Sequence, residues 1–327
     1  MVHRDLPDDG LPAEFGFIAR IFRPLAGHGA LDLRDDAAVF TPPSGRQLVM
    51  AADAMVEGVH FLPDDPADTV GRKLLRCNLS DLAAMDATPL GYLLTVSMPP
   101  ARDEAWFTGF AAGLAHDQQE YGLTLLGGDT TSTTGPLVLS LTIVGHVAPG
   151  MALRRSTARV GDGLWVTGTI GDGAMGLLAR CGKVSDADGY LADRYQLPRP
   201  RLGLDLRGIA SAGMDISDGL LQDVGHMARE SGVRAIIHAG QVPLSPAVRA
   251  LGPQWLPTCL GGGDDYELLL AVPPAHEARL VAHARQCGIQ VSRIGQVAAG
   301  TGVRVLDASG GDMALARRGW SHVGGGA

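Results

Sequence analysis

Short apolar runs recur along this chain, and each of them stops at a glycine or an acidic residue. Runs of this kind that end at turn-forming residues are typical of β-strands. Segments with apolar residues at helical spacing lie between them, at residues 67–87 and 103–120. The clearest runs are 47–52 before Asp53, 123–126 before Gly127 and 164–167 before Gly168. This alternation predicts an α/β or α+β fold.

The chain has 327 residues, more than one domain usually contains. Residues 149–162 include three arginines but show no strong periodicity, and a new strand-turn-helix unit follows them. We therefore expect two domains, residues 1–149 and residues 150–327. In the second domain we expect strands at 213–217, 233–239 and 266–272 and a helix at 218–230.

Charge and composition exclude several classes of protein. The formal net charge is −8 and no long run of Lys or Arg is present, which argues against binding of nucleic acid. The most apolar stretch, 137–147, is too short to span a membrane, and residues 1–10 lack the apolar centre of a secretion signal. The four cysteines are far apart and form no CxxC pair. We expect a soluble cytoplasmic protein that binds neither nucleic acid nor membrane.

Aspartates stand at several strand ends and turns. Asp36 closes an acidic pair in a loop, Asp53 follows a strand-like run, and Asp81 shares a helix face with Asn78. Each has an ordinary explanation as a solvated acid, a turn cap or part of a water-facing polar stripe. For Asp81 the surrounding apolar residues leave little exposed helix face, which favours a functional role.

Two glycine-containing strings are more suggestive. GGDTT at 127–131 predicts a turn whose backbone can approach a ligand, followed by the carboxylate of Asp129. DISDG at 215–219 places Asp215 and Ser217 on one side of a strand end, with Asp218 entering the next helix. The ordinary alternative is that Ser217 or Asp218 caps that helix.

The candidate ligands are hard oxygen donors, and no His/Cys cluster accompanies them. This donor set favours Mg²⁺ or Mn²⁺ over zinc. The chain has no GxxxxGK[ST], no DFG and no GxSxG, and its HRD at residues 3–5 is not kinase-like, because Gly10 stands where a kinase catalytic loop has asparagine. The familiar nucleotide-binding and hydrolase signatures are therefore absent. The string GDGAMG at 171–176 predicts a turn and the start of a helix.

Taken in order, six strings resemble the thiamine-monophosphate kinase family, within a superfamily that includes aminoimidazole ribonucleotide synthetase, selenophosphate synthetase and the hydrogenase maturation dehydratase. The resemblance runs from Phe15 to about His322. Each string is weak alone, whereas the six in order are highly specific. They are DDAAV (35–39), VEGVHF (56–61), NLSDLAAM (78–85), GGDTT (127–131), DISDG (215–219) and GGGDDYEL (261–268).

The resemblance implies an N-terminal α/β domain whose mixed sheet pairs with that of a second protomer, and a C-terminal α+β domain that closes over the nucleotide. A homodimer is expected. The implied reaction transfers the γ-phosphoryl group of ATP directly to thiamine monophosphate, with several Mg²⁺ ions as cofactors. Catalysis of such a transfer is chiefly alignment and charge neutralisation.

The resemblance also implies residue roles. Asp129 and Asp218 are expected to be catalytic. The expected magnesium ligands are Asp36, Asp53, Asp81, Asp129, Asp215 and Asp218. The expected nucleotide contacts are Gly128, Asp129, Arg155 and Ser217. The expected contacts to thiamine monophosphate are His60, Asp264 and Trp320, although His60 outside its string would be taken for a core histidine.

The chain departs from the family pattern at a few positions. Ala51 and Ala52 replace the usual Ser or Thr before Asp53, Asp264 replaces a glutamate, and Asp86 replaces a glycine. These changes motivate a non-catalytic alternative, a module that binds nucleotide and metal. Selenophosphate synthetase is disfavoured because no cysteine precedes Cys77. The hydrogenase maturation dehydratase is disfavoured because the chain does not end in a cysteine. The aminoimidazole ribonucleotide synthetase, a cyclase, is disfavoured because the strings at 56–61 and 264–268 resemble the kinase family more closely.

Overall fold

The computed structural model describes residues 12–313 and 319. These residues form two compact units. The first comprises the chain up to Asn78 together with Pro89–His146, and the second comprises Leu79–Thr88 together with the chain from Val147 on. The short segment 79–88 thus belongs with residues far along the chain, which no pattern in the sequence indicated. The division into domains 1–149 and 150–327 stays a prediction.

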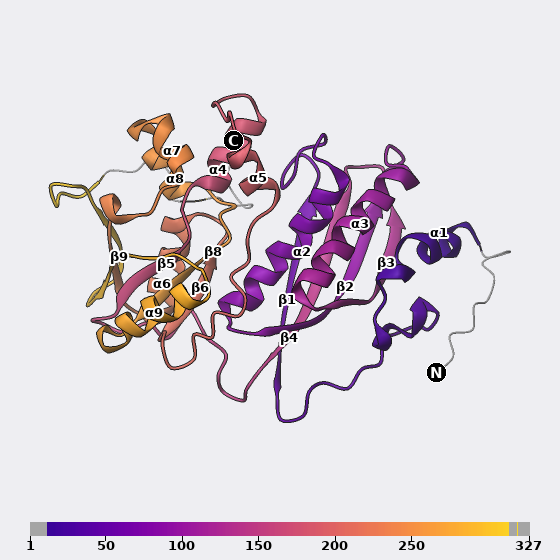
Figure 1. The fold of residues 1–327 in the computed structure, drawn as a ribbon, viewed down its shortest axis with the longest axis horizontal. Helices are drawn as coiled ribbons and strands as arrows, with labels where there is room; N and C mark the ends of the chain where they lie inside the picture. The colour runs from indigo at the N-terminus through magenta and orange to yellow at the C-terminus, as the bar shows by residue number, and fades with distance from the viewer. Residues whose placement is uncertain (1–11, 314–318, 320–327) are drawn as a thin grey trace. The chain divides into compact units, whose positions relative to one another are not determined.

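The first unit is built on a four-stranded sheet in the order β1-β4-β2-β3. Helices α2 and α3 lie on one face of it (Figure 1). Strands β2 and β3 are parallel. The elements are α1 (Ala13–Ile21), β1 (Gln47–Val56), α2 (Ala67–Ala84), β2 (Thr88–Met98), α3 (Glu104–Tyr121), β3 (Thr124–Ser132) and β4 (Val138–Val147), with 3-10 segments at Arg23–Leu25 and His28–Leu33.

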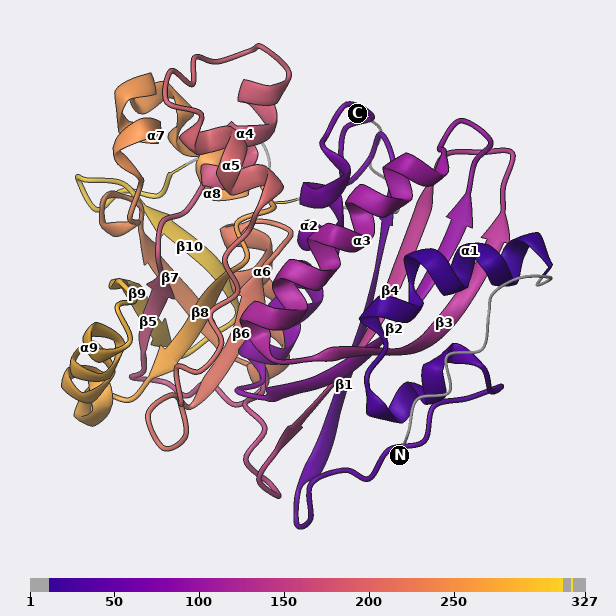
Figure 2. The same ribbon diagram turned by 45° about the vertical axis from the view of Figure 1, so that its right-hand side comes forward.

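A buried ion pair joins helices α2 and α3 of this unit. Asp117 of α3 is fully buried and accepts hydrogen bonds from Arg76 Nε at 2.6 Å and Arg72 Nε at 2.9 Å, both from α2. Two guanidinium groups thus compensate one carboxylate that water cannot reach. Asp103 caps α3 by accepting a hydrogen bond from the N–H of Trp106 at 2.9 Å. At the sheet edge, Ala26 forms a parallel bridge with Leu125 of β3. Figure 2 shows α1 on the β3 side of this sheet.

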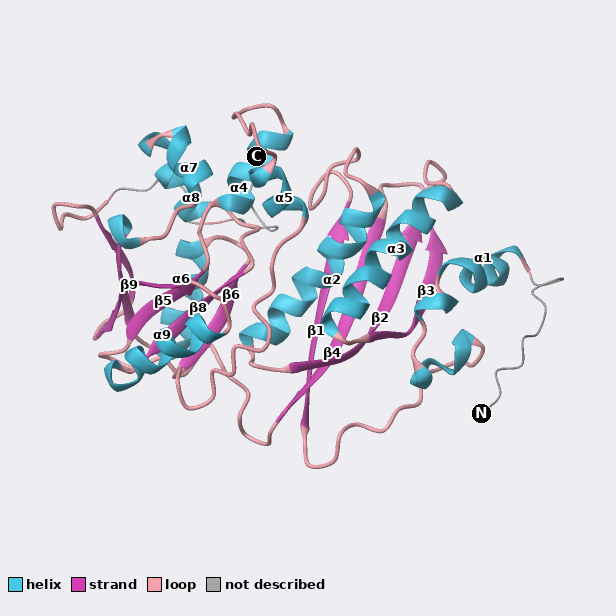
Figure 3. Ribbon diagram, in the orientation of Figure 1, coloured by secondary structure: helices cyan, strands magenta, loops and turns pink. Residues whose placement is uncertain are grey.

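The second unit is built on a six-stranded sheet in the order β10-β7-β9-β5-β8-β6. Strands β10 and β7 are parallel, whereas the other neighbouring pairs are antiparallel, so the sheet is mixed. The strands are β5 (Gly163–Thr167), β6 (Ala212–Ile216), β7 (Arg234–His238), β8 (Glu267–Val272), β9 (Val291–Ala298) and β10 (Gly302–Leu306). Figure 3 shows helices beside this sheet.

Both faces of this sheet are buried, as strand β8 shows. Leu269 and Ala271 pack in one cluster with helix α6 (Leu220–Ser231), while Leu268 and Leu270 pack in another with α9 (Glu277–Gln286). Successive side chains of a strand point to opposite faces, so a strand covered on both sides is apolar throughout. The smaller helices are α4 (Asp172–Arg180), α5 (Tyr190–Gln196), α7 (Pro246–Leu251) and α8 (Leu256–Gly261), with 3-10 segments at Ala239–Gln241, Pro253–Trp255 and Pro274–His276.

The expected mixture of helices and mixed sheets is confirmed, and pairing of the N-terminal sheet across a dimer stays a prediction. Two strand boundaries expected from the sequence are wrong. Asp53 lies inside β1 and not after its end, and Gly127 to Asp129 continue β3 and form no turn. Among the described residues, no helix combines the length and apolar character needed to cross a membrane.

Candidate functional site

In the first unit, Asp53 lies within β1 and is half-buried. Its backbone N–H donates to Asn78 Oδ1 of α2 at 3.2 Å, and Asn78 Nδ2 donates to the carbonyl of Leu74 at 2.9 Å. Asn78 is fully buried. The alternative that Asn78 belongs to a water-facing stripe is therefore wrong: this amide ties the strand of Asp53 to the helix.

Gly128 and Asp129 lie on β3, at the opposite edge of the same sheet, and Asp129 is exposed. The register of β2 and β3 shifts between Tyr92 and Leu93, where Leu126 is an extra residue in β3. A Cβ at Gly128 would clash with the carbonyl of Leu94, so only glycine allows this pairing.

The predicted ligands of this unit do not form one ion site. Three strand spacings separate β1 from β3, about 14 Å. Asp53 and Asp129 stand too far apart to share a single Mg²⁺, whose oxygen ligands lie at about 2.1 Å. Asp36 lies exposed in a bend outside any strand or helix.

His60 lies half-buried just after β1. Its Nδ1 accepts a hydrogen bond from the N–H of Val56 at 3.0 Å, and its carbonyl accepts one from Lys73 Nζ at 3.0 Å. An Nδ1 that accepts a backbone N–H places the ring proton on Nε2. The ring is therefore oriented by its own strand and is not a core residue.

In the second unit, Asp215 is the second-last residue of β6 and is only 6% exposed. Ser80 Oγ, from the last turns of α2, donates to Asp215 Oδ2 at 2.8 Å. Asp81 follows Ser80 and is half-buried. The structure thus brings the string at 78–85 and the string at 215–219 together, although Ser80 and Asp215 are 135 positions apart in the sequence.

Ser217 and Asp218 form the loop between β6 and α6. Their backbone N–H groups both donate to Asp223 Oδ2, each at 3.1 Å. The N-cap of α6 is Gly219, with no side-chain cap. The alternative that Ser217 or Asp218 caps the helix is therefore wrong, and Asp223 satisfies these amides from inside the first turn.

Asp223 is nearly fully buried, with 2% of its surface exposed. Burial, followed by the charges of Asp215 and Asp218, raises the pKa of its carboxyl to about 8. Ligand atoms of Asp218, Asp223 and His226 all lie within 4.8 Å of one another. Burial also lowers the pKa of His226. This corner of the unit concentrates negative charge where a divalent cation would stabilise it.

The turn at 261–266 lies directly against this loop. The N–H of Asp264 donates to the carbonyl of Ser217 at 2.9 Å, and the N–H of Tyr266 donates to the carbonyl of Ile216 at 2.8 Å. Gly219 has a φ of 116°, and a Cβ there would press on the backbone of Gly261. Ser217, which is expected to contact the nucleotide, and Asp264, which is expected to contact thiamine monophosphate, are therefore neighbours.

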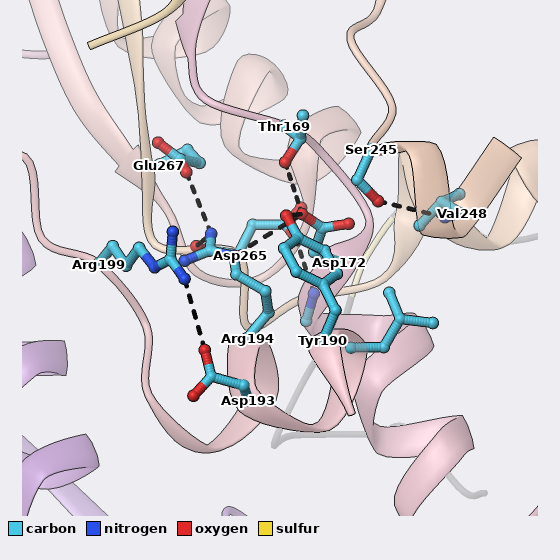
Figure 4. Close-up of polar contacts among 12 residues, drawn as sticks. Thr169, Asp172, Tyr190, Asp193, Arg194, Arg199, Ser245, Val248, Asp265 and Glu267 are labelled. Carbon is cyan, nitrogen blue, oxygen red and sulfur yellow. Dashed lines mark hydrogen bonds and ion pairs between the residues drawn. The ribbon is translucent and has the colours of Figure 1, made fainter. Parts of the chain in front are cut away.

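A buried polar cluster that includes Asp265 anchors this turn (Figure 4). Asp265 accepts hydrogen bonds from the N–H groups of Gly171 and Gly173, at 2.8 and 3.0 Å, where α4 begins. Burial raises the pKa of Asp265 well above its usual range. Arg194 Nη2 donates to Glu267 at 3.1 Å. The string at 171–176 is thus a turn and helix start, as expected, and it is anchored to the residue next to Asp264.

The remaining predicted residues are less constrained. Arg155 is exposed, and its carbonyl accepts a hydrogen bond from Ser231 Oγ at 2.9 Å. Trp320 lies outside the described residues. The roles assigned to all these side chains stay predictions.

A cavity of about 230 Å³ lies elsewhere in the second unit and contains none of the predicted site residues. Asp86, Arg154 and Arg207 contribute to its lining. Asp86 Oδ2 is buried and has no hydrogen-bond partner within the described part of the chain. Arg207 Nε is 4.0 Å away from it.

Sequence reasoning missed Ser80, Asp223 and Asp265 as supports of the site. A signal existed for Asp223, because it interrupts the apolar face that Leu220, Val224 and Met227 give to α6. An acid on the buried face of a helix requires a partner. Its partners are backbone amides, which no side-chain pattern reveals.

Comparison with known proteins adds independent findings. Residues 34–147 match the family model described as AIR synthase related protein, N-terminal domain, and residues 159–308 match the corresponding C-terminal domain. The thiamine-monophosphate kinase of Caulobacter vibrioides is 46% identical over 325 residues, which cover 95% of this chain and 91% of that protein.

Solved structures are similar along nearly the whole chain. The crystal structure of thiamine-monophosphate kinase from Stenotrophomonas maltophilia K279a has a TM-score of 0.82 and 40% identity, covering 92% of this chain and 98% of that one. The structure of AaThiL complexed with AMPPCP and TMP has a TM-score of 0.76 and 28% identity, covering 94% of this chain and 96% of that one.

Proposed function

Since this chain belongs to the thiamine-monophosphate kinase family, we propose that it transfers the γ-phosphoryl group of ATP to thiamine monophosphate, giving thiamine diphosphate and ADP, the last step of thiamine diphosphate biosynthesis. The observation that carries this proposal is the hydrogen bond between the Asp264 N–H and the Ser217 carbonyl. It makes neighbours of a residue expected to bind the nucleotide and one expected to bind the acceptor. A direct transfer requires such proximity.

Mg²⁺ fits the donor set of this chain. The donors are carboxylates and a hydroxyl, which are the ligands Mg²⁺ prefers. Burial, followed by the charges of Asp215 and Asp218, raises the pKa of Asp223, and a divalent cation would relieve the part that comes from these charges. We assign the ligands to Asp36, Asp53, Asp81, Asp129, Asp215 and Asp218. When bound, Mg²⁺ neutralises the phosphate charges and polarises the transferred group.

The large separation of Asp53 from Asp129 along the sheet supports more than one ion per active site. In this assignment, Asp129 and Asp218 are catalytic through the ions they hold. Gly128, Arg155 and Ser217 contact the nucleotide, and Arg155 supplies a direct positive charge to the phosphates.

His60, Asp264 and Trp320 bind the acceptor in this proposal. His60 Nδ1 accepts the N–H of Val56, which places the ring proton on Nε2, and in this proposal Nε2–H donates to a phosphate oxygen of the acceptor. The Asp264 carboxylate and the Trp320 ring favour the cationic thiazolium. No general base is needed, because the acceptor phosphate is ionised at neutral pH.

We further propose a cytoplasmic homodimer. Strand β1 is an edge strand, and its open face carries Leu48 and Met50, which are 44% and 62% exposed. Leu93 of β2 is exposed as well. Apolar side chains on an uncovered sheet are typical of an interface. Four free cysteines agree with a reducing compartment.

The test is incubation of the purified protein with ATP, Mg²⁺ and thiamine monophosphate, with thiamine diphosphate and ADP measured by chromatography. We expect equimolar products, and none when Mg²⁺ is removed with EDTA. ADP without thiamine diphosphate would overturn the assignment of the acceptor. Binding of ATP with neither product would support the non-catalytic alternative.

A further inference from the structure

Asp223 makes the most unusual contact near the proposed site. A single carboxylate oxygen, Oδ2, accepts from two successive backbone amides, those of Ser217 and Asp218. The donor residues are the two whose side chains we assign to nucleotide and metal. Asp223 itself is 2% exposed, and its Oδ2 is occupied by these two amides.

The loop is fixed from its other side as well. The carbonyls of Ile216 and Ser217 accept hydrogen bonds from Tyr266 and Asp264, so the turn at 261–266 holds the carbonyl edge while Asp223 holds the amide edge. Gln222 Nε2 donates to Asp218 Oδ2 at 2.8 Å and orients that carboxylate. Without Asp223, two amides of this loop would have no acceptor among the described contacts of the loop.

We propose that Asp223 is a positioning residue, which holds the Ser217–Asp218 backbone so that the Ser217 hydroxyl and the Asp218 carboxylate face the nucleotide and its metal. The catalytic consequence of this inference rests on the proposed function, whereas the hydrogen bonds of Asp223 are observed independently of it. A misplacement of about 1 Å in a catalytic group can cost about 100-fold in rate. Two hydrogen bonds to one buried acceptor are the means by which such an error is prevented.

The decisive comparison is Asp223→Ala against Asp223→Asn. Alanine removes the acceptor, whereas the amide oxygen of asparagine can occupy the place of Oδ2 and accept both N–H groups. We expect D223A to lose about 100-fold or more in kcat/KM for ATP and D223N to remain within about 10-fold of the wild type. An equal loss in the two variants would overturn the proposal, because charge and not the acceptor would then be required.

Asp186 offers a matched control in the same unit. Its carboxylate also accepts from two backbone amides, those of Leu191 at 3.1 Å and Ala192 at 2.9 Å, and it belongs to no assigned site. We expect D186A to lower the melting temperature, as D223A does, without changing kcat/KM. If activity falls equally in D186A and D223A, Asp223 is merely structural and the proposal fails.

Two further measurements separate this proposal from the proposed function and from misfolding. Calorimetric binding of Mg·AMPPCP does not involve the acceptor, so weaker binding by D223A than by D223N supports the positioning role even if the wild type makes no thiamine diphosphate. If D223A does not fold, hydrogen exchange in the wild type decides. Slow exchange of the Ser217 and Asp218 amides before nucleotide is added is the expected result, and fast exchange would overturn the proposal.

Discussion

At the scale of single residues, Asp86 occupies backbone space that suits glycine. Its φ is 55°, in the left-handed region, and the related proteins are expected to have glycine there. Its carboxylate is largely buried in the wall of the cavity, and burial raises its pKa above 3.8. The residue therefore combines an unfavourable backbone conformation with a poorly solvated acid.

We expect Asp86→Gly to increase the free energy of unfolding by about 1 kcal/mol, because glycine adopts positive φ at little cost. The folded state binds the Asp86 proton more tightly than the unfolded state does. The wild type therefore loses stability as the pH rises above about 3.8, relative to a variant without this acid. Urea unfolding of the wild type, D86G and D86N at several pH values would measure both effects.

D86N serves as the control, since it removes the charge but keeps a side chain at positive φ. It should lose the pH-dependent component without gaining the backbone component. Identical pH profiles for D86N and the wild type would contradict the assigned cause.

The proposed roles of Asp129 and His60 predict different kinetic defects. Asp129→Asn should lower kcat by about 1,000-fold, because it removes a charge from the metal that stabilises the transition state. His60→Ala should chiefly raise the KM for thiamine monophosphate, by about 10-fold, since it removes one hydrogen bond to the acceptor. Steady-state kinetics with both substrates varied would distinguish them, and equal losses in kcat would refute these roles.

At the scale of elements, the sequence predicted the helices well and the strand ends poorly. Apolar residues at helical spacing placed α2 and α3 within a few residues of their observed ends. The sequence pattern predicts that a strand ends before Asp53, but β1 continues to Val56. An acid that faces one side of a strand and an acid that ends it have the same local sequence, and only the neighbouring elements decide between them.

The candidate site was only partly predictable, because local sequence does not reveal which distant elements come into contact. Ordered strings identified Asp215, Ser217 and Asp264, and the structure makes Ser217 and Asp264 neighbours. The contact between Ser80 and Asp215 joins distant parts of the chain, and the contacts of Asp223 end on backbone amides. Neither kind of contact can be predicted from the spacing of residues in the sequence.

Strand β3 provides a test at this scale. Gly128→Ala should destabilise the first unit by about 2 kcal/mol, because its Cβ would clash with the carbonyl of Leu94 in β2. Gly127→Ala is the matched control, since the nearest atom to its Cβ is Leu93 Cδ2 at 3.5 Å, an ordinary contact. Thermal unfolding should separate the two neighbours, and similar melting temperatures would show that β2 can move away.

At the scale of the whole molecule, the open face of the first sheet predicts how the protein assembles. Met50→Glu should convert the proposed dimer into a monomer, because a charge at the centre of the proposed apolar interface would be desolvated without a partner. Val160→Glu is the control: Val160 is 61% exposed and Met50 62%, but Val160 lies outside the sheet. Light scattering after gel filtration would give the masses, and an unchanged mass for M50E would exclude this face.

The strand order of the second unit also governs how the newly made chain behaves on the ribosome. Trp165 of β5 pairs with Leu270 of β8 and with Arg293 of β9, which are synthesised much later. At about 5–20 residues per second, β5 waits several seconds for its first neighbour. During that interval an apolar strand remains without its sheet, so chaperone binding to a stalled chain that ends before β8 should exceed binding to the completed protein.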